Sequence, residues 1–255
     1  MKTYQELIRL YPKSDLTEEA QFRIAFLYIQ GRRWAEAIEE MDKVIRQFPQ
    51  GHHVVEARVE LGSLYLLLKD YAKALEQYEW VIKNHSQHPL AERAYLGVEE
   101  GYRGLGKMDQ AEKTLKELLG GSSQDDIQFE GQLRLGILCL NRQRFGEAVA
   151  ALSVAVRSPE ERVASQAHFA LGEAYLRAGN RESALVEFSR VVYLYPQRAD
   201  VMEEALLKLG ALYLEENKIF EARQAYQKLL EKSKRADRRE VARKMLDQMD
   251  RGIIR

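Results

Sequence analysis

A short pattern recurs six times along the chain at an almost constant spacing. An alanine is followed four positions later by a large apolar residue, and successive alanines lie 36 to 38 residues apart. The six alanines are Ala37, Ala74, Ala111, Ala148, Ala184 and Ala222. A small residue at a fixed place in each repeat lets a second helix approach closely, and a period of this length is typical of stacked helical hairpins. The pattern therefore predicts an all-α solenoid.

A second motif lies upstream of each alanine and predicts the partner helix of each hairpin. A large apolar residue is followed by a small one and, after two further positions, by an aromatic, as in Leu61, Gly62 and Tyr65. Apolar residues at these intervals share one face of a helix. Short polar turns such as residues 30–32 separate the two helices, and prolines end several repeats because they cannot continue a helix. These prolines are Pro12, Pro49 and Pro196.

In these motifs the sequence resembles the tetratricopeptide repeat family over essentially its whole length. The resemblance implies a right-handed superhelical solenoid of antiparallel helix hairpins that binds other proteins without catalysing a reaction. The period exceeds the family's usual one of about 34 residues, and the extra residues fall between repeats. In this respect the chain is similar to bacterial cell-envelope members of the family. They include the lipoprotein of the outer-membrane β-barrel assembly machine and the Tol-Pal coordinator protein.

The chain departs from the family pattern at several positions. The tryptophan of the family's first helix is absent from every repeat. Its place is taken by Gln21, Arg58, Tyr95, Gln132, His168 and Leu206. Glu99 stands at the small position of the third repeat, and Cys139 stands at the aromatic position of the fourth. These departures predict looser packing around the third and fourth repeats.

The repeat motifs also divide the chain. Residues 1–15 are expected to form the second helix of an incomplete repeat, because Pro12 closes a repeat whose alanine would precede Met1. This favours a piece of a longer protein, and a half-hairpin that caps the stack is the alternative. Residues 16–235 hold six repeats. Residues 236–255 predict a charged helix with an apolar side that covers the last repeat, as solenoids require.

Charge and composition exclude several classes of function. Lys plus Arg and Asp plus Glu both number 39, so no bulk field attracts nucleic acid or an anionic membrane. No apolar run approaches the roughly 18 residues that a membrane-spanning helix needs, which predicts no direct membrane span. No catalytic constellation or cofactor-binding glycine pattern is found, so we expect a protein that is not an enzyme.

Four histidines, His52, His53, His85 and His88, fall in two loops that are expected to lie next to each other. Solvated loop histidines are favoured over a metal site, because no cysteine or close carboxylate cluster accompanies them. Cys139 is expected to be a buried thiol without a basic partner. The sequence therefore predicts no metal and no cofactor.

The first helices of such a stack line its concave face, and their inward positions are unusually apolar. A long exposed apolar strip typically marks an interaction site, so we interpret this face as a groove for a partner peptide. The alternative is that some of these side chains turn into the hairpin cores. The candidate residues are Phe22, Phe26, Ile29, Val59, Leu66, Leu96, Glu100, Arg103, Leu133, Ile137, Leu140, Phe169, Glu173 and Leu207.

Charges gather at the two edges of the predicted stack. Asp125, Asp126, Glu160 and Glu161 fall on one edge. The opposite edge holds the basic residues of the intra-hairpin turns, which are Arg32, Arg33, Lys69, Lys107, Arg142, Arg144, Arg177, Arg181 and Lys218. This distribution indicates either a solvated rim or a contact with an acidic partner or anionic lipid headgroups.

Together these features favour a bacterial scaffold that binds a protein partner through the concave groove, in envelope assembly, secretion or polysaccharide export. The alternative is a module that self-assembles into homo-oligomers. We expect the periplasm or cell envelope as the location, with the cytoplasm as the alternative.

Overall fold

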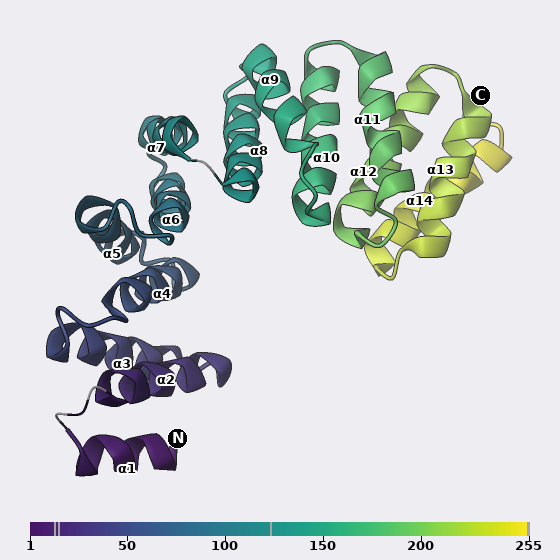
Figure 1. Ribbon diagram of the computed structural model, residues 1–255. Coiled ribbons are helices and arrows are strands. Elements are labelled where there is room, and N and C mark those ends of the chain that lie inside the picture. The colour runs from purple at the N-terminus through teal and green to yellow at the C-terminus, as the bar shows by residue number, and fades with distance from the viewer. Residues whose placement is uncertain (13, 15, 123, 254–255) are drawn as a thin grey trace. The chain divides into compact units, whose positions relative to one another are not determined.

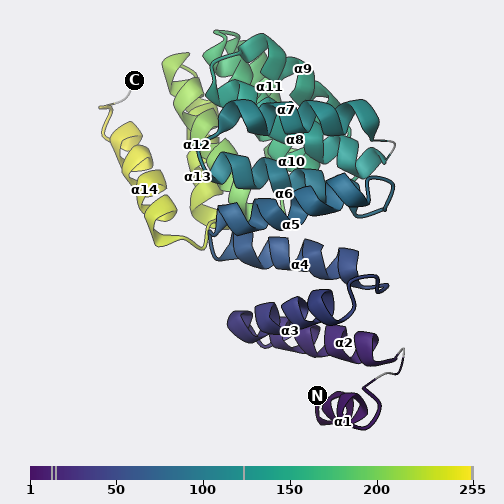
Figure 2. The ribbon, with the colours of Figure 1, turned by 90° about the vertical axis from the view of Figure 1, so that its left-hand side faces the viewer.

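The computed structural model describes residues 1–12, 14, 16–122 and 124–253. These residues form 14 α-helices and no strand (Figures 1 and 2). The helices divide into two compact units, Met1–Ser122 and Ser123–Arg255. In each unit, helices joined by short turns pack as antiparallel hairpins, so the predicted all-α fold of stacked hairpins is confirmed.

In the first unit, a single helix packs against the first of three hairpins (Figure 1). The single helix is α1 (Lys2–Leu10). The hairpins are α2 (Leu16–Gln30) with α3 (Trp34–Gln47), α4 (Val54–Leu67) with α5 (Tyr71–Asn84), and α6 (Ala91–Gly104) with α7 (Met108–Gly121).

In the second unit, three hairpins are followed by a final helix that packs against α13 (Figure 2). The hairpins are α8 (Asp125–Asn141) with α9 (Phe145–Ala155), α10 (Glu161–Arg177) with α11 (Arg181–Leu194), and α12 (Ala199–Glu215) with α13 (Ile219–Lys232). The final helix is α14 (Ala236–Asp250). Its buried residues are Ala242 and Met249, whereas Val241 is exposed.

Each intra-hairpin turn contains one residue with a left-handed backbone, at the same place in every repeat. These residues are Arg32, Lys69, Gly106, Gln143, Gly179 and Asn217. A left-handed residue just past a helix lets the next N–H reach back to a carbonyl of the last turn. The Arg33 N–H accordingly donates to the Tyr28 carbonyl at 2.9 Å, and the Asp70 N–H donates to the Tyr65 carbonyl at 2.8 Å. The six turns therefore reverse the chain in the same way.

The small residue of the first helix lies directly against the large apolar residue of the second. A Cβ added at Gly62 would lie 2.6 Å from Cζ of Tyr78, and one at Gly172 would lie 2.7 Å from Cε1 of Phe188. Ordinary contacts between carbon atoms are about 3.5–4.0 Å. A residue without a Cβ is therefore required for these helices to pack this closely.

The third and fourth hairpins bury their unusual residues. Glu99 takes the place of the glycine, and Leu115 stands at the repeat position that Tyr78 and Phe188 occupy. Both side chains are fully buried, and the Glu99 carboxylate pairs with Nε of Arg103 at 3.1 Å. Cys139 in the fourth hairpin is also fully buried. The substituted residues are thus buried within their hairpins, and the chain divides into its two compact units between the third and fourth hairpins, around which looser packing was expected.

Three hairpins place a polar pair where the family has its tryptophan. In each, the residue at that position bonds to the side chain three residues after the hairpin alanine. The pairs are Gln21 with Glu40, Arg58 with Gln77 at 2.8 Å, and His168 with Glu187 at 2.6 Å. Because buried polar groups are stable only when they are partnered, each pair holds its two helices in one register.

Candidate protein-binding surface

In both units, first helices of neighbouring hairpins contact one another. α4 contacts α6 in the first unit, and α10 contacts both α8 and α12 in the second. Among the described residues, successive second helices make no contact of that extent. The first helices therefore lie closer together than the second helices, which makes the first-helix face the inner face of each unit.

Five of the candidate residues do not line an exposed strip. They are Phe22, Val59, Leu96, Leu133 and Leu140, all of which are buried. The prediction that the inner face exposes one continuous apolar strip is therefore wrong for these positions. Phe22, Val59, Leu133 and Leu140 belong to the hydrophobic cores, as the alternative interpretation expected. The ring of His53, from the loop before α4, stacks on Phe22 with the ring centroids 4.6 Å apart.

The other candidates keep some accessible surface. Ile137 is 37% exposed. Glu100 is half-buried and Arg103 is exposed, although its guanidinium pairs with Glu99. The half-buried apolar candidates that pack at the edge of the cores are Phe26, Ile29, Leu66, Phe169 and Leu207. A role of these residues in binding a partner stays a prediction.

Ion pairs bridge neighbouring first helices across the inner face. They join Glu60 to Arg93 at 3.8 Å, Glu130 to Arg162 at 2.8 Å, and Glu173 to Lys208 at 2.7 Å. Burial raises the pKa of Glu130, but Arg134 and Arg162 outweigh burial and leave this pKa below its ordinary value. The candidate Glu173 thus belongs to a bridge between α10 and α12.

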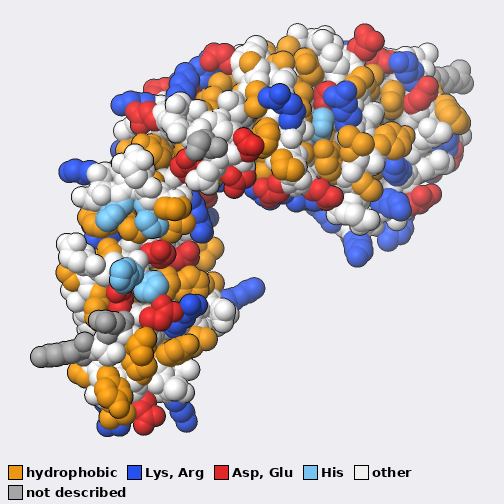
Figure 3. Space-filling model, in the orientation of Figure 1, with side chains coloured by type: hydrophobic (Ala, Val, Ile, Leu, Met, Phe, Trp, Pro, Cys, Tyr) orange, Lys and Arg blue, Asp and Glu red, His pale blue; other side chains and the backbone are white. Residues whose placement is uncertain are grey.

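The sequence reasoning missed these bridges. Opposite charges at same-face positions about one repeat apart are the signal that could have found them. The inner surface is therefore a series of apolar spots separated by ion pairs. In Figure 3, apolar side chains within each unit are likewise interspersed with charged ones.

The loop histidines are held by carboxylates of the preceding first helix. The N–H groups of His52 and His53 donate to the Glu18 carboxylate at 3.1 and 2.6 Å, and the His53 ring pairs with Glu19. Histidine side chains gather on one face of the first unit in Figure 3. Two carboxylates, from Glu18 and Glu19, therefore lie close to the first of these loops. In the part of the chain that the structure describes, no group of three or more His, Cys, Asp or Glu side chains could hold a metal ion.

The Cys139 thiol has a basic neighbour that the sequence reasoning did not anticipate. Nη2 of Arg144, in the turn that follows α8, lies 3.3 Å from Sγ. The thiol is nevertheless almost completely buried, at 1% exposure. A reagent in solution therefore has no direct access to the sulfur.

The basic turns are partly neutralised by nearby acidic residues. Arg33 pairs with Glu36 at 2.6 Å, and Arg181 pairs with Glu215 at 2.9 Å. Because these pairs are exposed, each contributes little to stability. Their arrangement favours the interpretation of this edge as a solvated rim.

Three family profiles, each described as a tetratricopeptide repeat, match residues 16–87, 133–199 and 204–235. The chain is built of tetratricopeptide repeats. No curated protein matches the sequence of this repeat protein. Among the described residues, no helix has both the length and the apolar character needed to cross a membrane.

Solved structures of other repeat proteins share this fold. A tetratricopeptide repeat protein from Parabacteroides merdae matches at 16% identity with a TM-score of 0.67, over 91% of this chain and 86% of its own. The type IV pilus biogenesis factor PilW matches at 17% identity with a TM-score of 0.65, over 84% of this chain and 92% of its own. YrrB, described as having an unusual peptide-binding site, matches at 15% identity with a TM-score of 0.57, over 79% of this chain and 96% of its own. At these identities the likeness shows the fold alone.

Proposed function

We propose that this tetratricopeptide-repeat chain is a non-catalytic scaffold that holds a partner peptide on the inner face of its hairpins. The observation that carries the proposal is the character of that face. Half-buried apolar side chains such as Leu66 and the exposed Ile137 alternate with ion pairs between neighbouring first helices. Apolar spots provide contact area for a partner, and the fixed charges between them provide specificity.

The peptide-binding description of YrrB, a protein with the same fold, supports this reading by analogy. For the setting, we propose the periplasm or cell envelope of a bacterium, in envelope assembly, secretion or polysaccharide export. The long repeat period supports it, and so does the likeness in fold to the pilus biogenesis factor PilW. A cytoplasmic location is the alternative.

Capture from bacterial extract tests both parts of the proposal. The chain and a Leu66→Gln/Ile137→Gln variant would each be immobilised and exposed to separate cytoplasmic and envelope fractions. Both sites are accessible at the surface, so the variant is expected to keep its helicity and lose the partner. Val241→Gln, which alters a side chain on α14 about as exposed as Ile137, is the control and should capture as the wild type does.

The outcomes separate the two parts. Equal capture by the wild type and the inner-face variant would rule out the inner face as the site. A partner found only in the cytoplasmic fraction would overturn the envelope setting and leave the inner face in place.

Self-association is a second candidate, favoured by the first helix of the structure. None of the residues of α1 is buried, and Leu10 and Tyr11 are 52% and 63% exposed. A molar mass that rises with concentration in light scattering, and that Leu10→Gln/Tyr11→Gln reduces to that of one chain, would support it.

A further inference from the structure

The outward face of α11 differs from that of the other five second helices. It carries Val186, Tyr193 and Leu194, which are two, nine and ten residues after the hairpin alanine and share one helix face. They are 46%, 74% and 60% exposed. The equivalent residues are Glu39, Arg46 and Gln47 in α3, Glu76, Lys83 and Asn84 in α5, Lys113, Gly120 and Gly121 in α7, Ala150 in α9 with Arg157 and Ser158 just after its end, and Gln224, Glu231 and Lys232 in α13.

The repeat thus provides its own internal comparison. A lone exposed apolar side chain on a protein surface needs no explanation, whereas a group of them marks an interaction site. Of the six equivalent faces, only that of α11 carries large apolar residues at all three positions.

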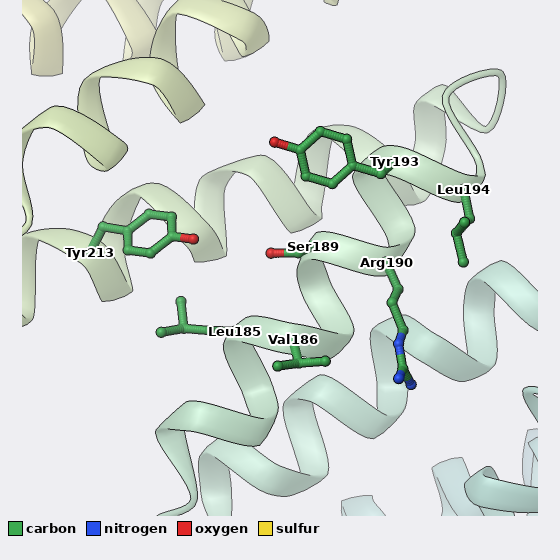
Figure 4. A pocket seen from close by; sticks show the side chains of 7 residues that line it. All are labelled: Leu185, Val186, Ser189, Arg190, Tyr193, Leu194 and Tyr213. Atoms are coloured by element: carbon green, nitrogen blue, oxygen red, sulfur yellow. The ribbon is translucent and has the colours of Figure 1, made fainter.

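These side chains line a hollow on the surface of the second unit. It has a volume of about 490 Å³ and is completed by Leu185, Ser189 and Arg190 of α11 and by Tyr213 of α12. Figure 4 shows Tyr213 reaching from α12 toward Leu185 and Ser189, while Arg190 extends away from it. A hollow of this volume accommodates a bulky side chain with its flanking backbone.

The first unit has a hollow at a similar place in the repeat, and different residues line it. It lies between α5, α6 and α7, with a volume of about 330 Å³. There Glu79 stands at the position of Ser189, and it accepts a hydrogen bond of 2.7 Å from the Tyr102 hydroxyl. This bond raises the pKa of Tyr102 to about 12. Two polar groups of that hollow therefore bond to each other, whereas the α11 hollow is lined mainly by apolar atoms.

The charges around the α11 hollow are positive. Nζ of Lys228, from α13, lies 4.4 Å from the centroid of the Tyr193 ring and forms no ion pair with a described carboxylate. Arg190 is half exposed, and its inner side donates to Glu187 at 2.8 Å. No carboxylate is among the residues that line this hollow. The rim therefore complements a negative group.

A second copy of the chain fits this face poorly. Arg190 lies midway between Val186 and Leu194 along α11. A two-fold axis through the apolar face would bring Arg190 of one copy against Arg190 of the other, because such interfaces pair each residue with its symmetry mate. Like charges placed together disfavour that pairing.

We propose that the outward face of α11 docks a peptide segment that carries a bulky apolar side chain flanked by Asp or Glu. The apolar side chain enters the hollow beside Tyr213, and the carboxylate meets Lys228 and Arg190. This surface lies on a second helix and is separate from the inner face formed by the first helices.

Selection from a phage-displayed library of random peptides tests the proposal on the full chain. Selected peptides are expected to share an apolar residue next to Asp or Glu. Labelled synthetic copies would then be titrated by fluorescence anisotropy against the wild type and a Val186→Glu/Tyr193→Lys/Leu194→Asn variant. This variant copies residues that α5 already carries at the same positions, so it should fold. Its affinity should fall by about tenfold or more, the loss expected when a large apolar contact is removed.

Two further variants make the result specific. Lys228→Glu should weaken the binding of acidic peptides and leave the helicity of the protein unchanged. The inner-face variant Leu66→Gln/Ile137→Gln should bind these peptides as the wild type does, which keeps this test independent of the proposed function.

Several results would overturn the proposal. They are recovery of no binder, selected peptides without acidic residues, and equal affinity for the wild type and the α11 variant. A dimer of the wild type that the α11 variant dissolves would assign the face to a second copy instead.

Discussion

The contact between Gly172 and Phe188 allows a sharp test of how the hairpins pack. In Gly172→Ala, the new Cβ would lie 2.7, 2.9 and 3.0 Å from three carbons of the Phe188 ring. That ring is completely buried and also packs against Phe169 at a centroid distance of 5.5 Å. The ring has no free space to move into, so α10 and α11 must separate slightly or the ring must leave its preferred rotamer.

The size of the effect follows from two opposing contributions. Overpacking a well-packed core typically costs about 1–3 kcal/mol. Alanine in place of glycine inside a helix stabilises the folded state by about 1 kcal/mol. Gly172→Ala is therefore expected to lower the free energy of unfolding by about 1 kcal/mol.

Hydrogen exchange read on α10 and α11, together with urea unfolding followed by circular dichroism, would measure these changes. Exchange is needed because repeat proteins can open locally. An unfolding transition measured over the whole chain would then report only part of a change in the stability of one hairpin. Gly146→Ala is the control, since an added Cβ there meets no atom within 4 Å and should be neutral or slightly stabilising. If Gly172→Ala slows exchange in α10 and raises stability, the close-contact explanation for the glycine is refuted.

Two further predictions concern buried polar groups. His168→Leu alone should destabilise the chain by about 1–3 kcal/mol, because it removes one partner of the buried Glu187 carboxylate. His168→Leu/Glu187→Ala, which copies the last hairpin, should recover most of this loss in urea unfolding, and a double variant no better than the single one would contradict the reasoning. Burial raises the pKa of Tyr78 from 10.0 to about 12. Because the folded state holds this proton more tightly, its contribution to stability is complete below about pH 10 and is lost as pH rises toward 12, by about 2–3 kcal/mol. Tyr78→Phe should show a shallower fall of the urea midpoint in this range, and parallel curves for the two proteins would contradict it.

The fold was predictable because its signals are local and repeated. The spacing of Ala37, Ala74 and their equivalents predicts the hairpins without knowledge of long-range contacts. The left-handed turn residues follow the same spacing, but only two of them, Gly106 and Gly179, are glycines whose residue type suggests a left-handed backbone. At Arg32 the backbone geometry could not be read from the residue type.

The candidate surface was harder to predict, because exposure of a first-helix residue depends on the next hairpin. Phe22 reads as an inward apolar residue, yet the ring of His53, from the following repeat, covers it. The polar pairs were missed for a different reason. Gln21, Arg58 and His168 were taken as departures from a tryptophan, although each has its partner 19 residues later in the same repeat.

These pairs also determine which pieces of the chain can be exchanged during evolution or design. Each pair lies wholly within one hairpin and differs chemically from the other two. A complete hairpin that is duplicated or moved therefore keeps both partners of its pair. A crossover inside a turn would join the first helix of one hairpin to the second helix of another. It would place Arg58 opposite Glu40, or His168 opposite Gln77, in a site built for a different side chain. The protein is therefore modular at the level of the whole hairpin, and its recombination boundaries lie in the longer loops between repeats.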